Sequence, residues 1–277
     1  MLWPYPAVMV KTKKTKTLLI ADPHLGWEME LQKKGIHIPS QTPKILTKLT
    51  AILDKYKPQQ LVIVGDVKYT VVSSELGEWH DVPDFFMKLC SHIGDIAIVR
   101  GNHDANIEPL LPENVTILPA SGAVIGDVAV FHGHKWPSPA LLGCKSLVMG
   151  HLHPVVVFRD QAGFKITRQV WMMANCDSES LAKILLQKHN VKIEGSIAQT
   201  LKKHYNVSLR SKEILIMPSF NDFLGGRPVN ETRPRKELGN EALIGPVLRS
   251  EALDVDNSEL YLLDGTYLGT LNQLRNI

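Results

Sequence analysis

The chain has 277 residues, of which 44% are hydrophobic and 21% are charged, and its formal net charge is +3. These values are typical of a globular protein with a substantial core. They exclude a disordered chain, and the mild positive charge permits an anionic substrate without requiring nucleic acid. Three cysteines without paired spacing, no apolar run near the ~18–20 residues of a membrane span, and lysines placed after the apolar start predict a cytoplasmic protein.

The first hundred residues alternate short apolar strands with amphipathic helices. Three parallel strands joined by right-handed crossovers are predicted at Thr17–Ala21, Leu61–Val64 and Ile96–Val99. A helix is predicted to begin with Thr42 as its N-cap residue and Pro43 at its first position, and to end at Pro58. A second helix is predicted at Val82–His92, whereas residues 25–40 show no regular pattern.

From residue 115 onward the apolar segments are closely spaced, and several are separated by glycine turns. Strands are predicted at Val115–Leu118, Ala123–Ile125, Val128–Phe131, Leu147–Met149, Val155–Phe158 and Phe164–Trp171. Strands with this spacing favour a second, mixed or antiparallel sheet. Two sheets packed face to face with helices outside predict an α/β fold, a four-layer α-β-β-α sandwich with two packed mixed sheets.

The last third of the chain begins with a basic helical pair. Helices are predicted at Ser178–Asn190 and Ser196–Tyr205, and we interpret them as a solvated hairpin in preference to a nucleic-acid surface. A further strand is predicted at Glu213–Met217. We expect residues 1–277 to form a single domain, with a possible helical insertion at about 178–206.

Polar side chains of the kinds that bind metals follow the apolar strands at five points. The motifs are Asp22-Pro23-His24, Gly65-Asp66, Gly101-Asn102-His103-Asp104, His132-Gly133-His134 and Gly150-His151-Leu152-His153. In open α/β sheets, ligands bind outside the carboxyl ends of the strands. We therefore expect these five loops to converge in space.

The chemistry of this set points to a pair of transition-metal ions. The candidate ligands are Asp22, His24, Asp66, Asn102, His132, His151 and His153. Carboxylate, amide and imidazole donors without thiolates suit Mn, Fe, Zn, Co or Ni, and the imidazole content is too high for Mg or Ca. Seven ligands exceed the needs of one ion, whereas two ions about 3.5–4 Å apart that share a carboxylate would use them all and could hold a phosphate.

Several of these residues have an ordinary explanation when taken singly. Asp22 and Asp66 could form turns after strands, Asn102 could be a left-handed turn residue, and His132 could be a buried core histidine. Ordinary explanations do not account for five such motifs in order, each at the end of an apolar strand.

The ordered series Asp-x-His, Gly-Asp, Gly-Asn-His-Asp, His-Gly-His and Gly-His-x-His, over about residues 17–171, resembles the calcineurin-like metallophosphoesterases. The segments 35–42, 218–221 and 263–269 resemble a narrower group, the archaeal and bacterial predicted phosphoesterases related to double-strand-break repair exonucleases. The family resemblance implies two divalent ions, most often manganese, with Fe, Zn, Ni or Co as alternatives. It also implies that a hydroxide bridging the ions attacks phosphorus.

The resemblance implies a role for each motif residue. The first ion would be held by Asp22, His24 and His153, and the second by Asn102, His132 and His151, with Asp66 bridging the two. His103 would act as general acid toward the leaving group, and Asp104 would orient His103 by accepting its other ring N–H. Family members commonly carry histidine where this chain has Tyr69, which puts the phosphate contact at this position in doubt; Lys68 or Tyr69 could serve instead.

Three functions follow as hypotheses. The first is a metal-dependent hydrolase of phosphomonoesters or phosphodiesters. The alternative is a nuclease on DNA or RNA, to which basic residues of the helical pair would contribute: Lys183, Lys188, Lys202 and Lys203. The third is a non-catalytic protein-interaction scaffold, and the complete set of ligand positions argues against it.

Overall fold

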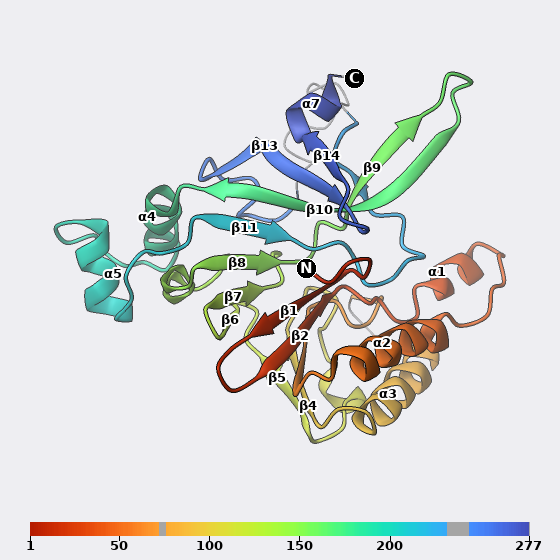
Figure 1. Ribbon diagram of the computed structural model, residues 1–277. Coiled ribbons are helices and arrows are strands. Elements are labelled where there is room, and N and C mark those ends of the chain that lie inside the picture. Colours follow the sequence, from red (N-terminus) through yellow and green to blue (C-terminus); the bar gives the residue numbers. More distant parts are fainter. Residues whose placement is uncertain (72–75, 232–243, 277) are drawn as a thin grey trace.

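The computed structural model describes residues 1–71, 76–231 and 244–276, and its two sheets pack face to face (Figure 1). The first sheet has the order β1-β2-β3-β4-β5, with β1 antiparallel to β2 and the other neighbours parallel. Its strands are β1 (Ala7–Lys11), β2 (Lys16–Ala21), β3 (Gln60–Val64), β4 (Asp95–Val99) and β5 (Val115–Leu118).

The second sheet is mixed. Its main path is β12-β9-β10-β11-β8-β7-β6, and β13 pairs with β10 and β14. Strands β7, β8 and β11 run parallel to one another. The strands are β6 (Ala123–Ile125), β7 (Val128–Phe131), β8 (Ser146–Met149), β9 (Pro154–Arg159), β10 (Lys165–Cys176), β11 (Glu213–Ile216), β12 (Arg227–Pro228), β13 (Leu253–Leu262) and β14 (Tyr267–Thr270).

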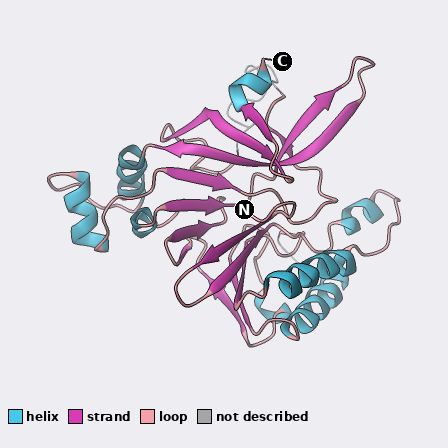
Figure 2. Cartoon of the chain, viewed as in Figure 1, coloured by secondary structure: helices cyan, strands magenta, loops and turns pink. Residues whose placement is uncertain are grey.

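Helices flank the two sheets (Figure 2). The described α-helices are α1 (Glu28–Lys33), α2 (Thr42–Tyr56), α3 (Leu76–Cys90), α4 (Ser178–Lys188), α5 (Ile197–Tyr205) and α7 (Leu271–Arg275). Short 3-10 helices are formed by Glu108–Leu110 and Pro139–Gly143. None of the described helices is both long enough and apolar enough to cross a membrane.

Side-chain alternation explains why the strands of the first sheet are apolar throughout. Leu18 and Ile20 of β2 pack in a core with α2 and α3, whereas Leu19 and Ala21 face the second sheet in a core that includes Trp171. A third core covers the outer face of the second sheet and contains the apolar side of α4. The predicted four-layer α-β-β-α sandwich is confirmed.

Some local predictions were wrong. Gln41 precedes the first helical residue of α2, and Thr42 lies inside the helix, where its hydroxyl donates to Asp81 at 3.2 Å instead of capping. Helix α1 forms within the stretch predicted to be irregular, and its buried Glu28 accepts the backbone N–H of Gln41 at 3.1 Å. The edge strand β1 was not predicted.

The helical pair departs from the solvated hairpin that was predicted. Helix α4 buries Leu181, Ala182, Leu185 and Leu186 against the second sheet, so it belongs to the outer layer of the fold. Helix α5 begins with a capping box, because the Ser196 hydroxyl accepts the N–H of Gln199 while the Gln199 side chain accepts the N–H of Ser196.

Candidate metal centre

The five motif loops meet at one edge of the two sheets. Because β2, β3 and β4 are parallel, the loops that follow them leave the first sheet at the same edge. The loops after β7 and β8 approach from the second sheet, and the backbone N–H of His151 donates to Asp22 at 2.9 Å. The loops surround a pocket of about 330 Å³ whose lining includes His24, Asp66, Tyr69, Asn102, His103, His151, His153 and Arg227.

One group of side chains contains Asp22, His24 and His153. Asp22 Oδ1 lies 3.4 Å from His153 Nε2, and the Nε2 atoms of His24 and His153 are 3.4 Å apart. Their candidate ligand atoms all lie within 4.8 Å of one another. The structure therefore brings together the three residues assigned to the first ion.

The second group contains Asn102, His132 and His151. His132 Nε2 lies 3.1 Å from Asn102 Oδ1 and 3.1 Å from His151 Nδ1. The other ring nitrogen of His132, Nδ1, lies 3.2 Å from the carbonyl oxygen of Val64. When Nδ1 donates a hydrogen bond to that carbonyl, Nε2 is the ring nitrogen that faces the group and can bind a metal.

Asp66 lies between the two groups. Its Oδ2 atom is 3.6 Å from His24 Nε2 and 3.3 Å from His132 Nε2, and its Oδ1 atom accepts the backbone N–H of His103 at 2.8 Å. This carboxylate is in the position expected of a ligand shared by two ions.

Burial and nearby charges shift the pKa values of the histidines in these groups. Burial lowers the pKa of His24 and of His151 to about 3, so both rings are neutral and have free lone pairs at neutral pH. Although burial disfavours its charged form, the carboxylates of Asp66 and Asp22 raise the pKa of His132 to about 10 in the metal-free protein.

The backbone at the ligands is strained. Asp22, His24, Asp66, His151 and His153 all have positive φ angles, between 43° and 69°. Residues with side chains seldom adopt this conformation, and it costs of order 1–3 kcal/mol at each position. Five such residues around one pocket indicate a site whose geometry is selected for function.

Two motif glycines are needed for the loops to approach closely. A Cβ atom on Gly101 would lie 2.1 Å from Asp66 Oδ1 and 2.3 Å from the Asp66 backbone nitrogen. A Cβ atom on Gly65 would lie 2.2 Å from His132 Nδ1. The glycines of the Gly-Asp and Gly-Asn-His-Asp motifs therefore make room for ligands on other loops.

The residues present fit a pair of metal ions. Asp22 Oδ1 is buried and receives no hydrogen bond from the part of the chain that the structure describes. The Nε2 atoms of His24 and His153 lie 3.4 Å apart, and together with this carboxylate oxygen, 3.4 Å from His153 Nε2, they form a set of converging metal-type ligand atoms. Such a set is unfavourable by itself and is stabilised by cations.

The predicted role of Asp104 was wrong in its geometry. One carboxylate oxygen accepts the backbone N–H groups of Asp66 and Gly101, at 2.9 and 2.7 Å, and the other accepts that of Val67 at 2.8 Å. His103 Nδ1 instead bonds the carbonyl oxygen of Tyr69, so that carbonyl orients the ring. Adjacency in the Asn-His-Asp motif does not bring the two side chains together, because the buried carboxylate is directed to three backbone amides.

Of the two residues considered for the phosphate contact after the Gly65-Asp66 motif, Lys68 and Tyr69, only Tyr69 lines the pocket. Tyr69 lines the metal pocket, with its ring centroid 5.8 Å from that of His24. Lys68 is fully buried and donates to the carbonyl oxygen of Thr70, so it does not serve as the phosphate contact considered for it.

The short strand β12 contributes a residue that sequence reasoning missed. Arg227 lines the pocket, and its backbone N–H donates to the carbonyl of His153 at 2.8 Å. Ser219 and Asn221 support the first ligand loop through hydrogen bonds to the carbonyl oxygens of Asp22 and Pro23. No strand-end signal in the sequence marks Arg227, because residues 217–226 separate it from the end of β11.

Comparison with solved structures finds three chains of low sequence identity. Similar solved structures are nuclease MPE from Pseudomonas putida (17% identity, TM-score 0.47, 93% of this chain and 97% of that chain covered) and the phosphoesterase YfcE from E. coli (18%, 0.33, 52% and 73%). A third is Vps29 from Chaetomium thermophilum (17%, 0.28, 53% and 67%). No curated protein matches the sequence.

The family itself is established by a different comparison. Residues 15–193, more than half of the chain and the part that carries all five motifs, match the model of the calcineurin-like phosphoesterases. Members of that family hydrolyse phosphoesters with the help of two metal ions. The chain belongs to the calcineurin-like phosphoesterase family.

Proposed function

We propose that this protein is a dimetal-dependent phosphoesterase that hydrolyses phosphomonoesters or phosphodiesters. The observation that carries the proposal is the position of the Asp66 carboxylate, 3.6 Å from His24 and 3.3 Å from His132, between two groups of metal-type ligands. Asp22, His24 and His153 would hold one ion, Asn102, His132 and His151 the other, and Asp66 both. When bound, the ions would lower the pKa of a water molecule and neutralise charge on the phosphate.

His103 is suited to give a proton to the leaving group. The carbonyl oxygen of Tyr69 can only accept, so the Nδ1 atom of His103 is the donor of their hydrogen bond. The protonated ring then has its second N–H at Nε2, which lies 3.9 Å from Asp66 Oδ2 and borders the pocket. A leaving alkoxide within reach of Nε2 would take that proton as the bond to phosphorus breaks.

Arg227 is suited to hold the phosphate. Its backbone is fixed against the His153 loop, and no ion pair joins its guanidinium to a carboxylate in the described part of the chain. A guanidinium binds two phosphate oxygens at once, which would orient the ester for in-line attack. We assign to Arg227 part of the phosphate contact that family members would make with the histidine found at the position of Tyr69.

The test is hydrolysis of p-nitrophenyl phosphate and bis-p-nitrophenyl phosphate by purified protein. Manganese should restore activity to protein treated with EDTA, and elemental analysis should find about two ions per chain. A folded protein that takes up no metal would contradict the proposal and favour the scaffold hypothesis. Manganese as the native ion and a cytoplasmic location remain predictions.

A further inference from the structure

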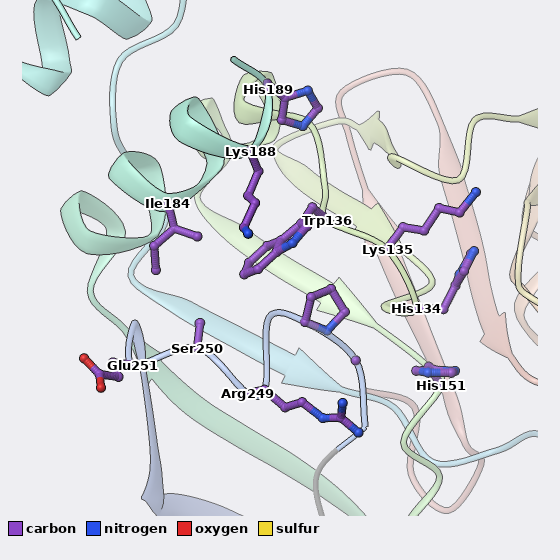
Figure 3. Close-up of a pocket in the computed structure, with 12 residues that line it drawn as sticks. His134, Lys135, Trp136, His151, Ile184, Lys188, His189, Arg249, Ser250 and Glu251 are labelled. Atoms are coloured by element: carbon purple, nitrogen blue, oxygen red, sulfur yellow. The ribbon is translucent and has the colours of Figure 1, made fainter. Parts of the chain in front are cut away.

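A second and larger pocket adjoins the metal centre (Figure 3). Its volume is about 990 Å³, and it shares His151 with the metal pocket. His134 connects the two, because its ring centroid is 5.2 Å from that of His132 and 6.2 Å from that of His151. A molecule with a phosphate at the metal centre could therefore continue into this pocket.

The lining of the second pocket is rich in positive charge. Lys135 follows the His132 motif, Lys188 ends α4, and Arg249 lies in the segment before β13; Glu251 is the only carboxylate among the lining residues. Within the described residues, neither Lys135 nor Lys188 forms an ion pair. Cations along one continuous path attract a chain of phosphates.

The pocket also offers an aromatic surface. Trp136 is half-buried and packs against the core of the second sheet while it lines the pocket. Figure 3 shows Lys188 extending from the end of α4 toward the space that Trp136 borders. An aromatic side chain beside phosphate-binding cations is the combination that binds unpaired nucleotides, since any base can stack on the ring.

We propose that this pocket binds single-stranded nucleic acid next to a phosphodiester held at the metal centre. The inference rests on the proposed function and specifies its substrate class. A pocket of about 300–1,000 Å³ accommodates a ligand of small-molecule size, here one or two nucleotides. A duplex keeps its bases stacked inside the helix and could not place one on Trp136.

One lysine of the helical pair, Lys188, contributes to the lining of this pocket. Lys188 lines it, whereas Lys183, Lys202 and Lys203 do not, and Lys203 pairs with Glu194. Lys183 and Lys188 are both exposed and belong to α4. They therefore form a matched pair, with the same helix and the same charge but different positions relative to the pocket.

The experiment measures binding of a fluorescein-labelled twelve-residue oligo(dT) by anisotropy, in EDTA so that no turnover occurs, at several salt concentrations. Lys188→Gln should weaken binding by about fivefold and reduce the slope of log Kd against log salt by about 1. Lys183→Gln should bind as the wild type does. Equal effects of the two substitutions would overturn the proposal, as would equal binding of a duplex of the same length.

A second pair of variants tests the aromatic surface. Trp136→Leu keeps an apolar side chain against the core and should weaken binding about tenfold. Trp79→Leu, at an exposed tryptophan of α3 outside the pocket, should have no effect. Thermal unfolding and manganese content verify that each variant is folded, and unchanged binding by folded Trp136→Leu would contradict the stacking role.

Failure of this inference and failure of the proposed function can be told apart. Wild-type protein that hydrolyses bis-p-nitrophenyl phosphate but does not bind oligo(dT) would overturn the inference alone. Protein that binds oligo(dT) through Lys188 in EDTA but hydrolyses no ester would support the binding site and overturn the proposed function.

Discussion

The side chain of Asp104 accepts the backbone N–H of Asp66 at 2.9 Å, and so joins two loops that carry metal-type ligands. The same carboxylate accepts from Val67 and Gly101, and it is fully buried. It therefore sets the position of Asp66 through the backbone and has no contact with the reacting atoms. Burial and the charge of Asp66 raise the pKa of Asp104 to about 6.

This arrangement predicts that Asp104→Asn is mainly a defect of stability and metal binding. An amide can accept with only one oxygen, so at least one of the three N–H groups loses its partner. We expect unfolding free energy to fall by about 2–3 kcal/mol, measured by urea denaturation. The dependence of kcat on leaving-group pKa should stay as in the wild type once manganese is saturating. A change in that dependence would instead favour a role for Asp104 in proton transfer.

Asp66 and His153 should differ in how many ions their loss removes. Asp66 faces both groups of ligands, whereas His153 contacts only the first. We expect Asp66→Asn to retain almost no manganese after dialysis and His153→Ala to retain about one ion per chain, measured by elemental analysis. Activity should fall by at least about 100-fold in both, because loss of a direct ligand costs more than loss of a residue that orients one. Equal metal content in the two variants would contradict the shared position of Asp66.

His103 can be tested through the leaving group. A general acid matters most when the departing oxygen is strongly basic and least for p-nitrophenolate, which leaves unprotonated. We expect His103→Gln to slow hydrolysis of an alkyl phosphate ester by about 10²–10⁴-fold and that of the p-nitrophenyl ester much less. Manganese content should remain at the wild-type value. Equal loss with both esters would show that His103 acts in another way, for instance as a ligand beside Asp66 and His24.

The five ligand loops could be predicted from the sequence because each follows an apolar strand, and parallel strands bring such loops to one edge. Side-chain direction could not be predicted. His103 and Asp104 are neighbours in the chain, yet one borders the pocket and the other turns to three backbone amides. Helix α1 was missed because six residues are too few to show an apolar period.

The larger pocket beside the metal centre was not predicted from the sequence, for a related reason. It combines Lys135 and Trp136, which follow a metal motif, with Lys188 at the end of α4 and a segment more than fifty residues further on. No local pattern connects these parts. Only the packing of α4 on the second sheet brings them to one space.

Arg227 provides the test of how substrate is held in a site that has Tyr69 in place of a histidine. Arg227 lines the same pocket as His24 and His153, and charge-assisted hydrogen bonds from a guanidinium to phosphate contribute about 1.5–3 kcal/mol. We therefore expect Arg227→Gln to lower kcat/KM for bis-p-nitrophenyl phosphate by about 10–100-fold, with manganese content unchanged. Arg227→Lys should recover only part of this loss, because an ammonium cannot bind two oxygens in one plane. Arg168→Gln, at an exposed position of β10, serves as the control of equal charge. If Arg227→Gln and Arg168→Gln have the same kcat/KM, the phosphate is held by other groups, and Tyr69 becomes the next residue to replace.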